Sequence, residues 1–268
     1  MAGHSKFKNI MHRKGAQDAR RAKKFARLIK ELQVAARSST DPESNPRLRT
    51  ALSACKSANM PKDNIQRVLN KANSGESDNL EDIRYEGYGP GGTAIIVEAL
   101  TDNRNRTASE VRSSFTKYNG NLGESGSVSY LFKNLGLIIY EKNEKFDVEE
   151  VLDFAIENGA IDVDFEENKI EILSSIPDFN DLRDKLEVKY GLPEQSEISW
   201  IPENYINLDE EKSLSMLKFL EALDNCEDVQ NVFGNFNLDS KASEKFIEDF
   251  RYRSRFKKNR LGIGCLEK

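Results

Sequence analysis

The fold is decided by residues 135–201, LGLIIYEKNEKFDVEEVLDFAIENGAIDVDFEENKIEILSSIPDFNDLRDKLEVKYGLPEQSEISWI, in which strand-like and helix-like hydrophobic patterns alternate. Strand-like patterns, with apolar residues adjacent or at every second position, occupy 135–141, 160–166, 169–174 and 197–201. Helix-like patterns, with apolar residues three and four positions apart, occupy 147–158 and 178–190. The resulting order, β-α-β-β-α-β, is that of a complete ferredoxin-like unit.

The segments on both sides of this unit have patterns typical of a second, central domain. Before the unit, we expect strands at Ile83–Tyr88 and Thr93–Leu100, a helix from the Thr107–Glu110 capping box to Tyr118, and a strand at Ser127–Phe132. After the unit, we expect a strand near Tyr205, a helix over 209–224 and a strand at Val229–Phe236. The sequence therefore predicts a central α/β domain, made of 78–134 and 204–239, with the ferredoxin-like domain, 135–203, inserted into it.

The first 77 residues are expected to form a basic arm, 1–15, followed by a domain of three short helices. In the first helix, over 16–37, helical spacing predicts a buried stripe of Ala22, Phe25, Ile29, Leu32 and Ala36. Its opposite side carries Arg20, Lys23, Lys24, Arg27 and Lys30. Asn45 is the expected cap of the second helix, and Pro61 precedes the third. With a basic C-terminal extension, 240–268, expected as a peripheral helix, the whole chain is assigned to the α+β class.

Charge is segregated along the chain. Residues 1–75 hold 17 Lys and Arg against 5 Asp and Glu, a net charge of +12. Residues 76–238 hold 14 against 35, a net charge of −21, and residues 239–268 hold 9 against 5. A basic N-terminal part on an acidic body directs one end of the protein toward a polyanion and keeps the rest away from it.

Composition also excludes some locations. No apolar run is long enough to cross a bilayer, and residues 1–15 lack the apolar core of a secretory signal. Cys55, Cys226 and Cys265 are odd in number and far apart, which favours free thiols over a disulfide framework. We therefore expect a cytoplasmic protein that has no membrane partner.

The sequence offers little for catalysis or metal binding. The only histidines, His4 and His12, lie in the basic arm without the other close-spaced ligands that zinc requires. The run Gly87–Gly92 precedes a strand rather than a helix, so it predicts a hairpin loop and not a phosphate-binding loop. No nucleophile elbow is present, and no histidine lies in the folded body to act as a base. We expect no enzymatic activity, metal, cofactor or small-molecule substrate.

The positive indication is for nucleic-acid binding by the arm and the first helix. Lys and Arg neutralise phosphates, histidines can contact phosphate or base edges, and an aromatic ring can stack on a base. The candidate residues are His4, Lys6, Phe7, Lys8, His12, Arg13, Lys14, Arg20, Arg21, Lys24 and Arg27. Arg104 and Arg106 form a second, smaller cluster, which either contacts the same ligand or completes a turn.

Several motifs resemble those of the YebC family. They are AGHSKF (2–7), HRKGAQD (12–18), NPRLR (45–49), YEGYGPGG (85–92) and TDNRNRT (101–107). The resemblance covers residues 1–238 and implies a three-domain fold with an N-terminal helical domain. Phe7 stands where the family usually has Trp, which weakens but keeps a stacking role, and residues 239–268 extend past the usual end.

The resemblance implies a regulator of gene expression of one of two kinds. Members of the family are DNA-binding transcriptional regulators or ribosome-associated activators of translation, so the partner is DNA or ribosomal RNA. The first helix carries long basic side chains and few Asn or Gln, which favours contact with backbone and shape over base edges. Two other functions stay open, a protein-interaction adaptor that uses the acidic body and an unrecognised hydrolase.

Overall fold

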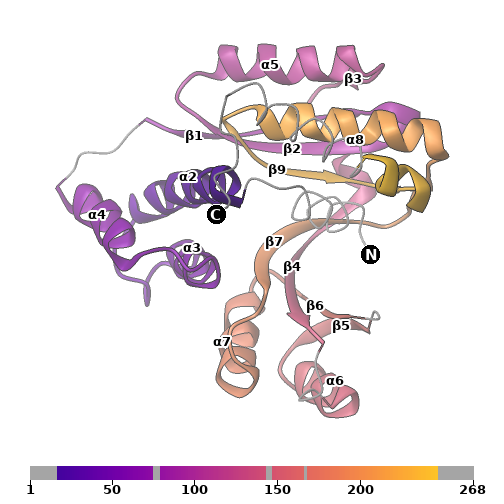
Figure 1. Ribbon diagram of the computed structural model, residues 1–268. Helices are drawn as coiled ribbons and strands as arrows, with labels where there is room; N and C mark the ends of the chain where they lie inside the picture. Colours follow the sequence, from indigo (N-terminus) through magenta and orange to yellow (C-terminus); the bar gives the residue numbers. More distant parts are fainter. Residues whose placement is uncertain (1–16, 75–78, 143–146, 166–167, 247–268) are drawn as a thin grey trace, which may run out of the picture. The chain divides into compact units, whose positions relative to one another are not determined.

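The computed structural model describes residues 17–74, 79–142, 147–165 and 168–246, with side chains from residue 21 onward (Figure 1). The chain divides into two compact units. One unit contains Asp82–Phe132 and the described residues from Pro202 onward, and the other contains Arg21–Glu81 and Lys133–Ile201. Helices are combined with largely antiparallel sheets in both, so the predicted α+β class is confirmed. The predicted domain boundaries remain predictions.

The first unit is built on a four-stranded sheet in the order β3-β1-β2-β9. Its strands are β1 (Glu81–Tyr88), β2 (Ala94–Thr101), β3 (Asn121–Leu122) and β9 (Val229–Gly234). β2 and β9 are antiparallel, with Ile96 opposite Phe233. The loop between β1 and β2 contains a 3-10 turn, η1 (Pro90–Gly92), in which Gly91 has φ 76°, a conformation that favours glycine.

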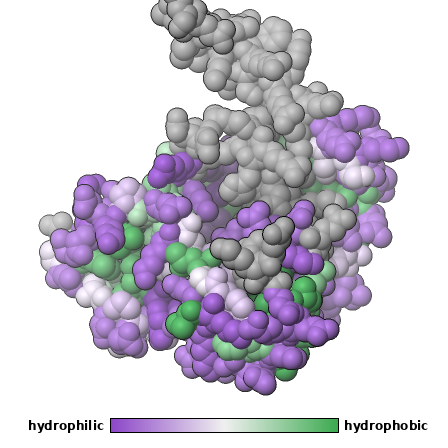
Figure 2. All heavy atoms as spheres, turned by 60° about the horizontal axis from the view of Figure 1, so that its bottom comes forward, coloured by the Kyte–Doolittle hydropathy of each residue, from purple (hydrophilic) through white to green (hydrophobic). Residues whose placement is uncertain are grey.

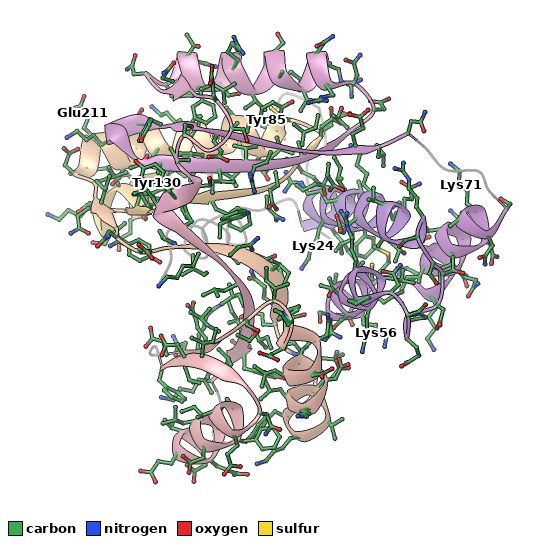
Figure 3. All side chains as sticks on the ribbon, turned by 180° about the vertical axis from the view of Figure 1, so that it is seen from behind. Lys24, Lys56, Lys71, Tyr85, Tyr130 and Glu211 are labelled. Carbon is green, nitrogen blue, oxygen red and sulfur yellow. The ribbon has the colours of Figure 1, made fainter. Side chains whose placement is uncertain are left out.

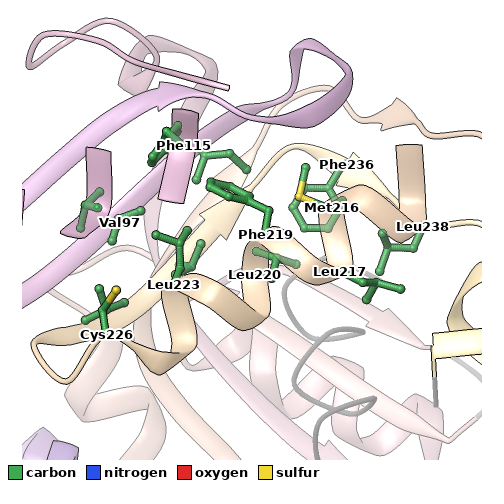
Figure 4. Close-up of a cluster of buried hydrophobic side chains, with 14 of the residues drawn as sticks. Val97, Phe115, Met216, Leu217, Phe219, Leu220, Leu223, Cys226, Phe236 and Leu238 are labelled. Carbon is green, nitrogen blue, oxygen red and sulfur yellow. The ribbon is translucent and has the colours of Figure 1, made fainter. Parts of the chain in front are cut away.

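Two helices cover one face of this sheet, α5 (Arg104–Lys117) and α8 (Glu210–Asn225). Their buried side chains meet Ile95 and Val97, which point to the same side because strand residues alternate. At the centre, the rings of Phe115 and Phe219 pack edge to face at a centroid distance of 4.9 Å (Figure 4). Aromatic burial of this kind stabilises the domain that carries the two ends of the ferredoxin-like segment.

Two predicted boundaries in this unit are wrong. Helix α5 begins at Arg104 rather than at a Thr107 cap, because the side chain of Asn103 accepts a hydrogen bond from the backbone N–H of Arg106. Residues before Phe132 form a 3-10 turn, η2 (Ser129–Leu131), and not a strand. The buried carboxylate of Glu86 accepts the backbone N–H groups of Val128 and Ser129, at 3.0 and 2.9 Å, so these donors are not available to a strand ladder.

The ferredoxin-like unit has the predicted order of elements. They are β4 (Phe132–Glu141), α6 (Val148–Glu157), β5 (Ala160–Phe165), β6 (Lys169–Ser174), α7 (Phe179–Tyr190) and β7 (Gln195–Pro202). The sheet order is β5-β6-β4-β7, and β6 is antiparallel to both of its neighbours. On the face of the sheet that the helices cover, Ile138, Ile170 and Ile172 form a buried core. Leu182 and Leu186 of α7 belong to the same core. Asp147 caps α6 through its side chain, as expected.

Three helices form the N-terminal domain, α2 (Gln17–Ala36), α3 (Pro46–Ser57) and α4 (Lys62–Asn73). Their shared core is made of small and aliphatic side chains, among them Leu32, Leu48 and Val68. Asn45 caps α3, since its Oδ1 accepts from the N–H of Leu48, and its Nδ2 donates to the carbonyl of Ala35 at 2.7 Å. One side chain therefore joins the end of α2 to the start of α3.

The remaining described elements are short. β8 (Ile206–Asn207) and β10 (Phe236–Asn237) form a parallel pair, and residues 240–246 are helical. Hydrophilic side chains cover most of the coloured surface in Figure 2, with hydrophobic ones in small groups. None of the helices in the described ranges is long and apolar enough to cross a membrane.

Candidate nucleic-acid interface

Helix α2 is anchored mainly by its C-terminal half. Leu32, Ala35 and Ala36 are buried in the core of the helical domain, whereas Phe25 and Ile29 pack against that core only partly buried. Ala22, which the spacing predicts to be buried, is exposed. The side chains from Arg21 to Lys24 are therefore less buried than a simple amphipathic helix predicts.

Two of the predicted basic residues lie openly on this part of the helix. Arg21 and Lys24 are exposed, and Lys24 can be seen on α2 in Figure 3. The guanidinium of Arg21 lies 5.2 Å from the ring centroid of Phe25, a cation–π contact that restricts its orientation. Arg27 was expected on the exposed ridge but is half-buried, as are Lys23 and Lys30. Fewer basic side chains are therefore exposed on α2 than the sequence pattern predicts.

The acidic residue among the described side chains of α2 does not add uncompensated negative charge. Glu31 is the only Asp or Glu in residues 21–36, and Arg47 of α3 binds it with two hydrogen bonds. The Arg47 Nε to Glu31 Oε1 distance is 2.8 Å, and the Nη2 to Oε2 distance is 3.2 Å. This paired arrangement neutralises Glu31 with a residue of another helix.

In the second predicted cluster, Arg104 and Arg106 are exposed, but Arg106 is paired with carboxylates of the central domain. Nη2 of Arg106 donates to Asp228 Oδ2 and to Asp102 Oδ1, both at 2.8 Å. Asp228 is only 4% exposed, and it also accepts from the hydroxyls of Thr101 and Thr107. The hydrogen bond with Asp228, followed by the one with Asp102, raises the pKa of Arg106 further above its ordinary value. Arg106 therefore joins α5 to the turn before β9.

Arg104 lies in the first turn of α5 near Tyr85, whose hydroxyl donates to the Arg104 carbonyl at 3.4 Å. Burial raises the pKa of Tyr85, and the positive charge of Arg104 partly offsets this effect. The other predicted residues are in the basic arm, and His4, Lys6, Phe7, Lys8, His12, Arg13 and Lys14 lie outside the described residues. Arg20 belongs to α2, but its side chain is also outside the described part.

The sequence interpretation overlooked the polar face of α4. Lys62, Gln66, Arg67, Asn70 and Asn73 are all exposed on this helix. The signal was present, because the apolar stripe of the third helix places these residues on its opposite side. The predicted site was defined by charge, and the amide side chains of α4 carry none.

The described part of the chain offers little support for metal binding or for catalysis by a thiol. No group of three or more His, Cys, Asp or Glu residues there could hold a metal ion. Cys55 is a free, buried thiol, and burial raises its pKa to about 11. A thiol with such a pKa is mostly protonated at neutral pH and is a poor nucleophile.

Comparisons with known proteins identify the family. The model of the TACO1/YebC N-terminal domain matches residues 5–75, and that of the TACO1/YebC second and third domain matches residues 80–236. A probable transcriptional regulatory protein of Rickettsia rickettsii is 53% identical over 248 residues, which are 91% of this chain and 98% of that protein. A similarly named protein of Rickettsia bellii is 53% identical over 247 residues, 91% of this chain and 96% of its own.

A solved structure is also similar over most of the chain. It is the crystal structure of a conserved hypothetical protein from Aquifex aeolicus, with a TM-score of 0.75 and 44% sequence identity. The match covers 83% of this chain and 93% of the Aquifex chain. The family models, the relatives and the shared fold agree with the motifs in the sequence, and the chain belongs to the TACO1/YebC family.

Proposed function

We propose that this protein is a non-enzymatic regulator of gene expression that binds nucleic acid through the basic face of its helical domain. We define this basic face as Arg21 and Lys24 of α2 together with the arm that precedes them. The observation that carries the proposal is the exposure of Arg21 and Lys24 on a helix whose only acidic residue beyond position 20, Glu31, is already bound by Arg47. The names of the Rickettsia relatives support a role in regulation.

The chemistry of this face suits the sugar–phosphate backbone. Exposed Lys and Arg side chains neutralise phosphates and release the counterions around them, which favours binding without specifying a base sequence. The same polyanion would repel the acidic body, so the helical domain would be the part of the protein that faces the ligand. Arg106 is left out of the proposed basic face because its Nη2 already binds two carboxylates.

Duplex DNA and structured RNA share the phosphate chemistry that this face would bind. Binding to duplex DNA would make the protein a regulator of transcription, and binding to ribosomal RNA would make it an activator of translation. The proposal therefore covers both ligands, and the experiment has to compare them at equal salt concentration.

The test reverses the charge of the two exposed residues in the full chain, Arg21→Glu with Lys24→Glu. Each phosphate contact contributes roughly 0.7–0.9 to the slope of log affinity against log salt, so the slope should flatten by about 1.5. The matched control is Lys185→Glu with Lys218→Glu, which changes the same number of charges on exposed positions of α7 and α8. The control should bind as the wild type does.

Two ligands are measured in parallel, a duplex DNA and a folded fragment of ribosomal RNA. Tighter binding to one of them at the same salt concentration selects transcription or translation. If the wild type shows no salt dependence with either ligand, or if the charge-reversed variant binds unchanged, the proposal fails. A protein-interaction adaptor that uses the acidic body would then be the better account.

A further inference from the structure

We infer that α4 is a second nucleic-acid-binding element and that it contacts base edges through Gln66, Arg67 and Asn70. The inference rests on the proposed function and deepens it. The basic face of α2 has the chemistry to hold a backbone, and α4 presents exposed amide side chains, whereas Gln33 of α2 is half-buried. The base-contacting face is defined here as Lys62, Gln66, Arg67, Asn70 and Asn73.

The chain enters α4 through a connection known from DNA-binding proteins. α3 ends at Ser57 and α4 begins at Lys62, so only residues 58–61 join them. Asn59 has φ 53°, the left-handed conformation that a tight turn between helices requires. Met60 is buried, and its N–H donates to the carbonyl of Cys55 at 3.0 Å, which fixes the turn. A short turn of this kind joins the two helices of a helix-turn-helix, whose second helix contacts base edges.

The packing of α4 decides which side chains are presented. Ile65, Val68, Leu69 and Ala72 pack into the core of the helical domain, with Val68 fully buried. At 3.6 residues per turn, Gln66, Asn70 and Asn73 then share the polar side with Asp63, and Lys62 and Arg67 lie at its two edges. All six are exposed. Lys71, on the same helix, is labelled in Figure 3.

The side chains on this face match the hydrogen-bonding groups of purines. Nε2 of Gln66 donates to Oδ1 of Asn70 at 2.9 Å, so the two amides hold each other in a defined orientation. This pairing leaves the Gln66 carbonyl as an acceptor and the Asn70 amide as a donor. Adenine presents the complementary N6 donor and N7 acceptor, and the guanidinium of Arg67 is suited to O6 and N7 of guanine.

A solvated helix surface would have a different composition. Asn is less favourable than Ala, Glu or Lys inside a helix by roughly half a kcal/mol per residue. The exposed side of α8, by comparison, carries Glu211, Lys212 and Lys218. Lys62 and Asp63 both stand in the first turn of α4, so their charges offset each other near the helix dipole, and no side chain caps that end. An amide at exposed position 70, where a better helix former would serve solubility equally well, indicates another use.

The experiment first asks whether the full-length protein prefers any sequence. Wild-type protein is used to select from two random libraries, duplex DNA and RNA hairpins with random loops. One of them should yield an enriched, purine-containing motif, and the library that does so identifies the source of the base edges. If neither library is enriched in a motif, the inference is overturned.

The second step compares binding of the selected motif with binding of its scrambled sequence. In the variant Gln66→Ala with Asn70→Ala, affinity for the motif should fall roughly 10-fold to 100-fold, the value of a bidentate base contact. Affinity for the scrambled sequence and the salt slope should stay as in the wild type. The matched control is Asn207→Ala with Asn237→Ala, which removes another hydrogen-bonded amide pair, with Nδ2 to Oδ1 at 3.0 Å.

The outcomes separate this inference from the function on which it rests. If the α2 charge reversal weakens binding but the α4 variant keeps its sequence preference, the inference fails and the proposed function stands. If the α4 variant binds every sequence more weakly by the same factor, α4 contacts the backbone only, and the inference fails again. The α4 variant should unfold at or slightly above the wild-type temperature, because both substituted residues are exposed and Ala is the better helix former.

Discussion

The helical domain and the central domain differ in what holds them together. The central core brings together Phe115, Phe219 and Phe236 with a row of leucines from α8. In the helical domain, the fully buried residues within the described part of the chain are small or aliphatic and include no aromatic ring. Since stabilisation scales with the apolar area removed from water, we expect the central domain to be the more stable of the two.

This difference shows a division of tasks within one chain. The domain that would bind nucleic acid has the smaller core and the exposed Arg21 and Lys24, whereas the domain with the larger core pairs Arg106 with two carboxylates. A ligand that binds only the folded helical domain would add to its stability by mass action. Elements with low intrinsic stability are the ones that most often order on binding.

The largest effect is expected from Phe219→Ala in the central core. The side chain is fully buried and contacts Phe115, so its loss should lower the free energy of unfolding by about 3–5 kcal/mol. Chemical denaturation measures this change. A loss below about 1 kcal/mol would mean that the core collapses around the cavity and that the contrast between the two domains is overstated.

A somewhat smaller and more local effect is expected from Leu32→Ala in the helical core. Leu32 is fully buried, and its truncation should cost about 2–4 kcal/mol. Because the helical domain is the weaker one, hydrogen exchange should quicken in α2, α3 and α4 while β2 and β9 keep their protection. Equal loss of protection in both domains would show that they unfold together, contrary to the comparison.

An effect that depends on pH is expected from Glu86→Gln. Burial raises the pKa of Glu86, but backbone N–H donors from Val128, Gly126 and Ser129 and the charge of Arg84 outweigh burial, and the net shift is downward. A carboxylate with a lowered pKa stabilises the fold above its unfolded pKa of about 4.3, and this contribution disappears as pH falls through the folded value.

At neutral pH, Glu86→Gln should therefore lower the free energy of unfolding by about 1–3 kcal/mol. The difference between wild type and variant should narrow as the pH is lowered from about 5 to about 3. Unfolding curves at several pH values provide the measurement. A difference that stays constant over that range would attribute the loss to shape and not to charge.

The smallest effects concern two Asn caps, one in each domain. Asn103→Ala should cost less than about 1 kcal/mol, since its side chain makes one capping bond to the Arg106 N–H. Asn45→Ala should cost about 1–2 kcal/mol, because Asn45 is buried and its amide also bonds the carbonyls of Ala35 and Ser39. Denaturation of the two variants in parallel tests the order, and a greater cost for Asn103→Ala would reverse it.

Much of the fold could be predicted because its determinants are local. Each determinant can be seen within a few residues of sequence. Examples are the Asn45 cap, Pro61 before the third helix, and the alternating strand-like and helix-like patterns of the ferredoxin-like unit. The failures have distant causes. The expected strand at Ser127–Phe132 does not form because Glu86, more than forty residues earlier, takes its backbone donors.

The candidate site shows the same limit. Local charge identifies Arg21 and Lys24, which are exposed as expected. Local charge also assigns Arg106 to the nucleic-acid-binding site. This arginine, however, is paired with a buried aspartate that lies 122 positions later in the chain. Whether a cation also pairs with an internal carboxylate depends on tertiary contacts, and no pattern near Arg106 could reveal its partner.

One backbone hydrogen bond described by the structure has a consequence for how such a chain can be assembled. The N–H of Glu203 donates to the carbonyl of Leu131 at 3.0 Å, so the chain leaves and re-enters the central domain at a single point. With the ends held together, the length of what lies between them matters little, since each doubling of a loop costs only about 0.6 kcal/mol. A short glycine turn in place of 133–201 should close the same gap, and a different small domain should be accepted there. The gene segments that encode the chain next to Leu131 and Glu203 are therefore points at which recombination can insert, remove or exchange a whole domain without breaking the central domain.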